Sequence, residues 1–121
     1  LVRSRGLGDV YKRQLSKVPV KFSDRSACCV IIASKGYPVK YESGFPVVLP
    51  ADGEDGVIYV AGAKRTESGL VSAGGRVLGV TATADSLREA VDAAYAKVKK
   101  VKFDNGFYRK DIGARALAAK E

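Results

Sequence analysis

The sequence has no His, no Met and no Trp, and it has only two Cys among 121 residues. Without His, every mechanism that uses an imidazole as general base or metal ligand is excluded within this chain. Two Cys alone cannot complete a tetrahedral zinc site, so we expect no metal site here. Because Met is absent, the sequence does not begin at a translation start, and we expect a fragment of a longer protein.

Long apolar runs and spaced cysteines are also missing. The longest apolar run, Ala27–Ala33, has seven residues, whereas a membrane-spanning helix needs about 20. The two cysteines, Cys28 and Cys29, are adjacent, and a disulfide between neighbours would have strained geometry. No signal-peptide pattern opens the sequence. We therefore expect reduced cysteines, a cytoplasmic protein and no membrane partner.

The charge balance is basic, with 21 Lys and Arg against 13 Asp and Glu and a net charge of +8. Such a balance favours nucleic-acid binding, because neutralisation of phosphates dominates that affinity. However, aromatic interleaving is thin and no nucleic-acid motif is present. We expect a solvated helix face and no nucleic-acid partner, and a basic RNA-binding module is the alternative. The densest cluster comprises Lys97, Lys99, Lys100, Lys102, Arg109 and Lys110.

The first fourteen residues, LVRSRGLGDVYKRQ, show no helical or strand periodicity. They resemble a stray leader of the kind produced when adaptor sequence is translated at the end of a read. We interpret residues 1–14 as a non-native leader and residues 15–121 as the domain.

Apolar segments bounded by turn residues predict strands. Leu70–Ser72 predicts a short strand, which the turn at residues 67–69 joins to the strand before it. Phe45–Leu49 is also apolar, but Pro46 restricts it to a sheet edge. Strands so close in sequence predict a small antiparallel sheet. The longer strand segments are residues 27–34, 57–62 and 75–83.

From Asp85 onward the apolar spacing changes to that of a helix. Ser86 followed by Glu89 forms a capping-box pattern, which predicts a helix start there and an end near Lys100. Residues 111–120 predict a second, shorter helix. Strands followed by helices predict an α+β domain. The expected apolar stripe of the long helix is Leu87, Val91, Ala94, Tyr95 and Val98.

No Walker loop and no Gly-x-Ser-x-Gly elbow is present. Two basic residues instead follow glycine turns: Lys64 follows Gly62, and Arg76 follows Gly74 and Gly75. Arg binds phosphate through two parallel hydrogen bonds, and Lys adds a point charge. The pattern is compatible with a phosphate site, but Gly74 and Gly75 are more often a plain hairpin turn.

Five short motifs occur in an order that resembles the C-terminal domain of the phosphoribosylamine-glycine ligase (glycinamide ribonucleotide synthetase) family. The resemblance runs from about Ala27 to the end of the chain. The motifs are GYPVKYESG at 36–44, VAGAK at 60–64, GGRVLGVTA at 74–82, SLREAVDAAY at 86–95 and FYRKDIGARAL at 107–117.

The family is an ATP-grasp ligase of purine biosynthesis that joins glycine to 5-phosphoribosylamine through a glycyl phosphate. The resemblance implies a β-rich barrel-sandwich hybrid with one long and one short helix, which packs on the protein's own upstream domains and caps the active site. It implies that Lys64 and Arg76, with Gly74 and Gly75, bind the substrate phosphate. ATP and magnesium are then bound by upstream ATP-grasp domains absent from this sequence, so we expect no catalytic residues and no activity in this chain alone.

The sequence departs from the family at two places. Val60-Ala61-Gly62-Ala63 stands where members often have His-Ala-Gly-Thr, and Val39 follows Gly-Tyr-Pro where Gly is usual. The C-terminal domain of another ATP-grasp ligase or carboxylase is the alternative within the superfamily. For Tyr37 we expect loop packing, and for Arg109, Lys110 and Asp111 a local ion pair and a helix cap.

Deleting residues 1–14 should leave the melting temperature of the chain nearly unchanged. A segment without packing partners usually contributes less than about 0.5 kcal/mol to the free energy of unfolding. Differential scanning calorimetry of the chain with and without the segment measures the effect. A fall of several degrees would show that the segment belongs to the fold.

Overall fold

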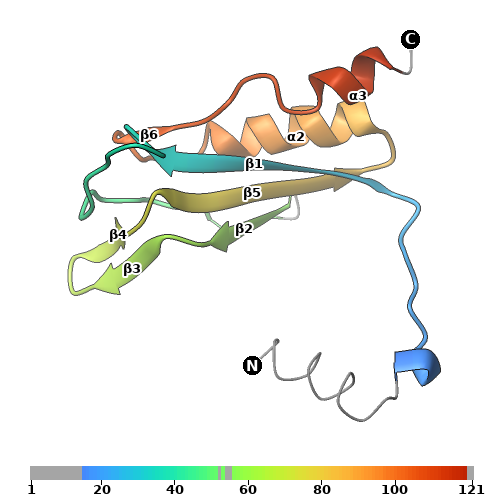
Figure 1. The fold of residues 1–121 in the computed structure, drawn as a ribbon, viewed down its shortest axis with the longest axis horizontal. Helices are drawn as coiled ribbons and strands as arrows, with labels where there is room; N and C mark the ends of the chain where they lie inside the picture. Colours follow the sequence, from blue (N-terminus) through green and yellow to red (C-terminus); the bar gives the residue numbers. More distant parts are fainter. Residues whose placement is uncertain (1–14, 52, 54–55, 120–121) are drawn as a thin grey trace.

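Two long antiparallel strands, β1 (Ser26–Ser34) and β5 (Arg76–Ala84), form the centre of the fold (Figure 1). They belong to a four-stranded antiparallel sheet in the order β2-β5-β1-β6, in which β2 is Val57–Val60 and β6 is Gly106–Phe107. The computed structural model describes residues 15–51, 53 and 56–119. The interpretation of residues 1–14 as a leader therefore lies outside the described residues.

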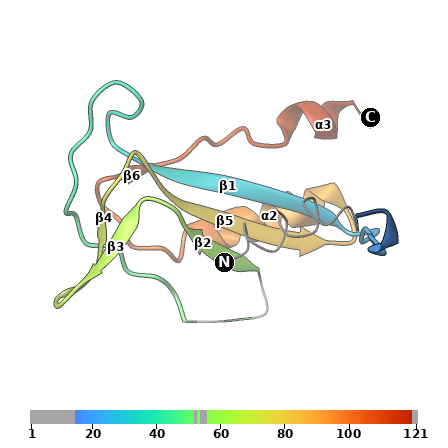
Figure 2. The same ribbon diagram turned by 60° about the horizontal axis from the view of Figure 1, so that its bottom comes forward.

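Side chains alternate between the two faces of this sheet, as the pleat of a strand requires. In β1, Cys28, Val30 and Ile32 are buried, whereas Cys29 and Ile31 between them are exposed. Helix α2 (Leu87–Val98) covers the face that carries the buried set and packs along β1 and β5 (Figure 2). The helix contributes Ala90, Val91, Ala94 and Val98 to the same hydrophobic core.

The start of α2 has the predicted capping box. The hydroxyl of Ser86 accepts a hydrogen bond from the Glu89 backbone N–H at 3.2 Å, and the Glu89 carboxylate accepts one from the Ser86 N–H at 3.2 Å. Both bonds satisfy donors that a helix start leaves free. The helical segment predicted from Asp85 to about Lys100 is therefore confirmed.

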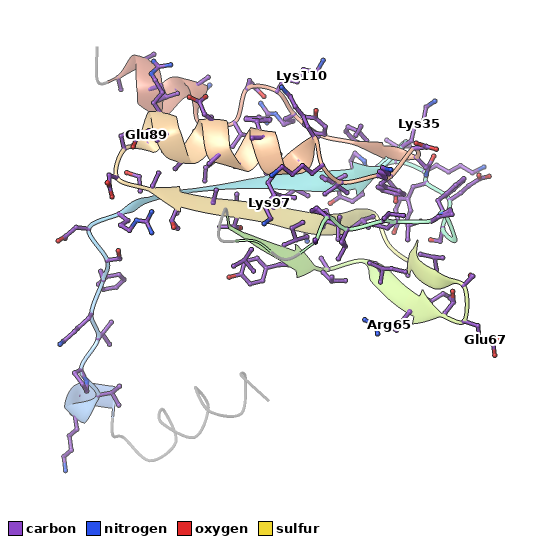
Figure 3. The ribbon with its side chains drawn as sticks, turned by 180° about the vertical axis from the view of Figure 1, so that it is seen from behind. Lys35, Arg65, Glu67, Glu89, Lys97 and Lys110 are labelled. Carbon is purple, nitrogen blue, oxygen red and sulfur yellow. The ribbon has the colours of Figure 1, made fainter. Side chains whose placement is uncertain are left out.

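The expectation that the lysines of the basic cluster lie on a solvated helix face is wrong for Lys97. Its side chain is only 5% exposed and lies beside Leu49, Pro50 and Ile58. Figure 3 shows it against the sheet, whereas Lys35 and Lys110 point outward. At three residues past Ala94, Lys97 lies on the inward side of α2, and its aliphatic stem packs there. Lys99, Lys100 and Lys102 are exposed as expected.

The predicted hairpin between residues 57–62 and 70–72 is wrong. An additional strand, β3 (Ala63–Thr66), pairs with β4 (Gly69–Ser72) in a separate two-stranded sheet. Strand β2 pairs with β5 instead. Strand β3 reads Ala-Lys-Arg-Thr, so it has no run of apolar residues that would mark it in the sequence.

The segment at residues 45–49 connects these parts through isolated bridges rather than a strand. Pro46 is bridged to Val71 of β4, and Val48 is bridged to Lys102 after α2. The short helix α3 (Ala114–Ala118) follows β6, and a 3-10 turn, η1 (Leu15–Lys17), precedes β1. Two backbone hydrogen bonds join residues 45–49 to the chain after α2. The Val48 N–H donates to Lys102 O at 2.8 Å, and the Lys102 N–H donates to Val48 O at 3.0 Å.

The α+β class, with one longer and one short helix, is confirmed. Within the described residues the strands form two open sheets, and no closed barrel is seen. No helix in that part of the chain is long and apolar enough to cross a bilayer.

Val80→Ala should destabilise the domain by about 2 kcal/mol or more, because Val80 is fully buried and its removal loses apolar contact and leaves a cavity. The same change at Val57, which pairs with the neighbouring Thr81 but is 51% exposed, should cost well under half as much. Urea denaturation of both variants provides the comparison. Equal losses would contradict the assignment of the core to the α2 side of the sheet.

Candidate functional site

Arg76 begins β5 and lines a pocket of about 460 Å³. The other lining residues come from four segments: β1, the loop after it, the turn after β2 and the turn before β5. No carboxylate is among them, so the guanidinium charge is not neutralised within the pocket. The complete lining is Ile31, Tyr37, Ala61, Gly62, Gly75 and Arg76.

Gly62, which lines this pocket, is in close backbone contact with Gly74. A Cβ on Gly62 would collide with the backbone oxygen of Arg76 and with the Cα of Gly74. The contact is held by the Ala73 N–H, which donates to the Gly62 carbonyl at 2.7 Å, and by the Gly62 N–H, which donates to Val77 O at 3.1 Å. Glycine is therefore needed at position 62 for space.

Ser34 and Tyr37 hold the Gly74–Gly75 turn from the other side. Ser34 is fully buried; its hydroxyl donates to Gly74 O at 2.8 Å and its backbone N–H donates to Gly75 O at 2.7 Å. The Tyr37 ring lies where a Gly75 side chain would be, and its centroid is 6.0 Å from that of Tyr41. The expected loop packing of Tyr37 is confirmed, and the same ring also lines the Arg76 pocket.

Lys64 lies outside the pocket lining. It is exposed on β3, opposite Val71. Because it follows Gly62 by two residues, their Cα atoms are no more than about 7 Å apart, and an extended Lys side chain can span that distance. The structure thus brings Arg76, Gly75 and Gly62 together and leaves Lys64 on the neighbouring strand. Within the part of the chain that is described, neither Lys64 nor Arg76 forms an ion pair.

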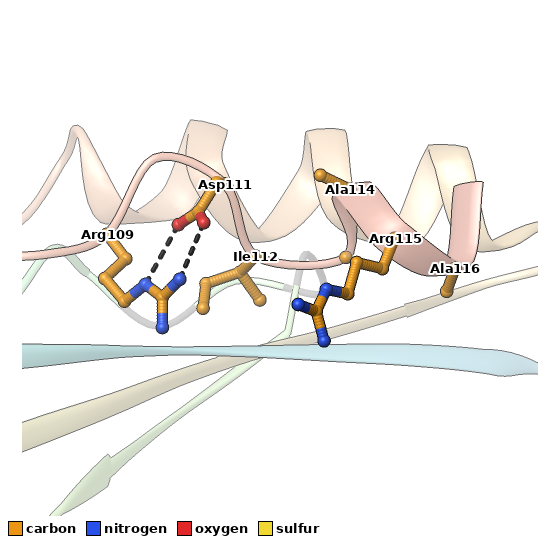
Figure 4. Close-up of a pocket in the computed structure, with 7 residues that line it drawn as sticks. Arg109, Asp111, Ile112, Ala114, Arg115 and Ala116 are labelled. Carbon is orange, nitrogen blue, oxygen red and sulfur yellow. Dashed lines mark hydrogen bonds and ion pairs between the residues drawn. The ribbon is translucent and has the colours of Figure 1, made fainter. Parts of the chain in front are cut away.

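A second pocket, of about 520 Å³, lies at the start of α3 (Figure 4). The Arg109 guanidinium donates two hydrogen bonds to the Asp111 carboxylate, from Nε at 3.0 Å and from Nη2 at 2.6 Å. These bonds lower the pKa of Asp111, so the pair stabilises the fold at neutral pH and loses its contribution as the pH falls through that pKa. Both side chains are exposed, which keeps the contribution small. The predicted ion pair is confirmed.

The helix cap expected at Asp111 is wrong. Gly113 occupies the N-cap position of α3 with φ of 85°, and no side chain caps the helix. Asp111 instead contributes its backbone carbonyl, which accepts a hydrogen bond from the Ala114 N–H at 3.1 Å. The loop before α3 is fixed by Tyr95, whose hydroxyl donates to Arg109 O at 2.6 Å and accepts from the Ile112 N–H at 3.1 Å.

The described residues do not fit a metal site, because no group of three or more His, Cys, Asp or Glu lies together among them. Sequence reasoning also missed Ile31, which lines the Arg76 pocket, and Ser34, which holds the turn beside it. For Ser34 the sequence holds a signal, because it ends an apolar strand segment. A hydroxyl buried there needs a hydrogen-bond partner.

Residues 27–115 match the family described as "Phosphoribosylglycinamide synthetase, C domain". The chain belongs to this family. The match includes the Arg76 pocket, the β3–β4 hairpin and α2, so the residues described above are features of a C domain of this kind.

This C domain is similar to phosphoribosylamine–glycine ligases over most of its length. It is 47% identical to that of Rhizobium meliloti (strain 1021) over 105 residues, which are 86% of this chain and 25% of the relative. It is 36% identical to that of Fusobacterium nucleatum over 118 residues, 94% of this chain and 28% of the relative. The chain therefore spans about a quarter of the length of these curated relatives.

A solved structure shows the same relationship. The crystal structure of the phosphoribosylamine–glycine ligase of Thermotoga maritima has a TM-score of 0.66 and 38% sequence identity, and the match covers 71% of this chain and 21% of that one. These matches do not favour either alternative, the RNA-binding module or the C domain of a different ATP-grasp enzyme.

Gly62→Ala should destabilise this C domain by about 1–3 kcal/mol, since the new methyl group overlaps backbone atoms that cannot move aside easily. Gly79→Ala is the matched control, because a Cβ there meets Cys29 and Ile31 at ordinary contact distances of 3.4 and 3.5 Å. Thermal melts of both variants measure the difference. If Gly62→Ala were as stable as Gly79→Ala, the two backbones would not be in contact.

Proposed function

We propose that this chain is the C-terminal domain of a phosphoribosylamine–glycine ligase, which joins glycine to 5-phosphoribosylamine in an ATP-dependent reaction of purine biosynthesis. The names of its relatives support the reaction. The observation that supports a role for this domain is the Arg76 pocket, where an unpaired guanidinium lies beside glycine backbone and an aromatic ring.

In this proposal Arg76 binds the phosphate of 5-phosphoribosylamine. Its guanidinium can donate two parallel hydrogen bonds to a phosphate, and no carboxylate in the pocket lining competes for it. Gly62 and Gly75 line the pocket beside the Arg76 side chain with backbone, because the space of their missing side chains is filled by neighbouring backbone and by the Tyr37 ring. Lys64 adds a second positive charge from β3, as a point charge without a fixed geometry.

The domain would thus hold one end of the substrate while the reacting amine extends beyond it. Positioning of this kind lowers the barrier by holding the reactants in a productive geometry. ATP and magnesium would bind in the remainder of the longer protein, which also supplies the groups that carry out the reaction. We propose a cytoplasmic location, which suits free thiols such as Cys28 and Cys29.

A chimera tests the proposal, with residues 27–115 of this chain in place of the matching segment of the Rhizobium meliloti enzyme. Arg76→Ala should lower kcat/KM for 5-phosphoribosylamine about 10- to 100-fold, the equivalent of a charge-assisted contact of roughly 1.5–3 kcal/mol. Lys64→Ala should act in the same direction. KM values for glycine and ATP should stay nearly normal, because neither ligand carries this phosphate.

Two comparisons make the result specific. Arg76→Lys should recover only part of the loss, since an ammonium cannot form the two-pronged contact. Arg65 is exposed on the β3–β4 hairpin that also carries Lys64, and it lies outside the Arg76 pocket. Arg65→Ala should therefore leave the kinetics unchanged. The 121-residue chain alone serves as the inactive baseline. Normal use of 5-phosphoribosylamine by both alanine variants would exclude the phosphate site.

A further inference from the structure

Lys97 on α2 carries a buried charge that has no partner in the described part of the chain. Its side chain is 5% exposed, and Figure 3 shows it against the main sheet. Within the residues that the structure describes, its ammonium forms no hydrogen bond and no ion pair. Burial of a charge is unfavourable unless an opposite charge or hydrogen bonds compensate it. The Lys97 ammonium is therefore ready to bind an acceptor.

A pocket of about 320 Å³ lies at Lys97, and we call it the Lys97 pocket. It is formed by α2, the start of β2 and the chain before β2. Small-molecule sites commonly combine apolar walls with a few polar groups that orient the ligand, and this volume lies at the lower end of their range. No carboxylate is among the lining residues. Its apolar side chains are those of Leu49, Pro50, Ala51, Val57 and Ile58.

The walls of the Lys97 pocket are held by the main sheet and by α2. Ile58 pairs with the fully buried Val80 of β5 and packs against the hydrophobic core. The backbone of Gly56 lies so close to Thr81 O that a Cβ at position 56 would collide with it. Lys97 is part of α2, which packs along β1 and β5. A site whose groups are held in place before binding loses less conformational entropy when a ligand enters.

The Lys97 pocket is distinct from the Arg76 pocket, and the two share no lining residue. Val57 of the Lys97 pocket pairs with Thr81, which follows Arg76 by five residues on β5. At about 3.3 Å per residue, these two positions on the strand are about 16 Å apart. A small ligand in one pocket therefore does not occupy the other, and a ligand at Lys97 does not depend on the proposed phosphate contact.

The residues of the Lys97 pocket indicate the chemical class of its ligand. A single lysine offers a compact point charge, whereas Arg binds phosphate through two parallel hydrogen bonds. Apolar walls favour a ligand with an apolar body. We infer that the Lys97 pocket binds a small monocarboxylic acid. Its carboxylate accepts hydrogen bonds from the Lys97 ammonium, and its apolar body lies against Leu49 and Ile58.

Hexanoate is the probe for this site, and the 121-residue chain is the protein tested. A titration followed by heteronuclear NMR should shift the backbone amide signals of Gly56, Ile58 and Lys97 and give a dissociation constant. Hexanol has a similar apolar body without the charge. It should bind about tenfold or more weakly than hexanoate, which is the equivalent of losing one charge-assisted contact. Acetate, which has the charge without the apolar body, should also bind more weakly.

Lys97→Met removes the ammonium and keeps an unbranched, flexible side chain. This change should weaken hexanoate binding about tenfold or more. It should not lower the melting temperature of the chain, because the charge that it removes is buried and has no partner among the described residues. Lys99→Met is the matched control. Lys99 is exposed at the C-cap of α2, so the affinity of this variant for hexanoate should be unchanged.

These measurements do not involve ligase activity, so their outcome is independent of the proposed function. Equal affinity for hexanoate and hexanol, or equal hexanoate affinity of Lys97→Met and the unchanged chain, would overturn the inference. A fall of several degrees in the melting temperature of Lys97→Met would show that the ammonium already has a partner in the fold. A variant with Asp52→Asn, Glu54→Gln and Asp55→Asn tests the acidic residues that precede β2 in the sequence. Hexanoate binding by this variant alone would identify the chain's own carboxylates as that partner and overturn the inference.

Discussion

The packing of α2 against β1 and β5 is the interaction on which the rest of this domain depends. Among the described residues, α2 is the one helix long enough to cover the main sheet, and it buries one face through alternate strand residues such as Val30 and Val80. The burial of apolar side chains supplies the dominant favourable contribution to folding. A single covering helix therefore determines which side chains form the core and which remain outside it.

The position of the candidate site follows from the same arrangement. Strand β5 is anchored along its length by β1 and α2, so its first residue, Arg76, is held on a rigid element. The turn before it is fixed independently, by the buried Ser34 and by the contact of Gly74 with Gly62. Sites on rigid elements hold their geometry better than sites on loops, and the phosphate contact proposed for Arg76 would have such support.

Within the described residues, the helix leaves the other face of the sheet uncovered, and Ile31, Val57 and Tyr59 are exposed there. A small domain buries a limited share of its surface, and here the uncovered share is apolar. Ile31, which lies on this face, also lines the Arg76 pocket.

Local sequence patterns were sufficient to predict several elements of this fold. The capping box at Ser86, the apolar stripe of α2 and the strands β1 and β5 could be predicted because neighbouring residues carry those signals. The order of short motifs likewise placed the chain in its family. Strand β3 escaped prediction because its polar residues form a strand only by pairing with β4. Only the tertiary structure decided that Gly62 packs on Gly74 and that Arg76 rather than Lys64 lines the pocket, because those contacts join separate segments of the chain. It also decided that Lys97 is buried, because this depends on which side of α2 faces its neighbours.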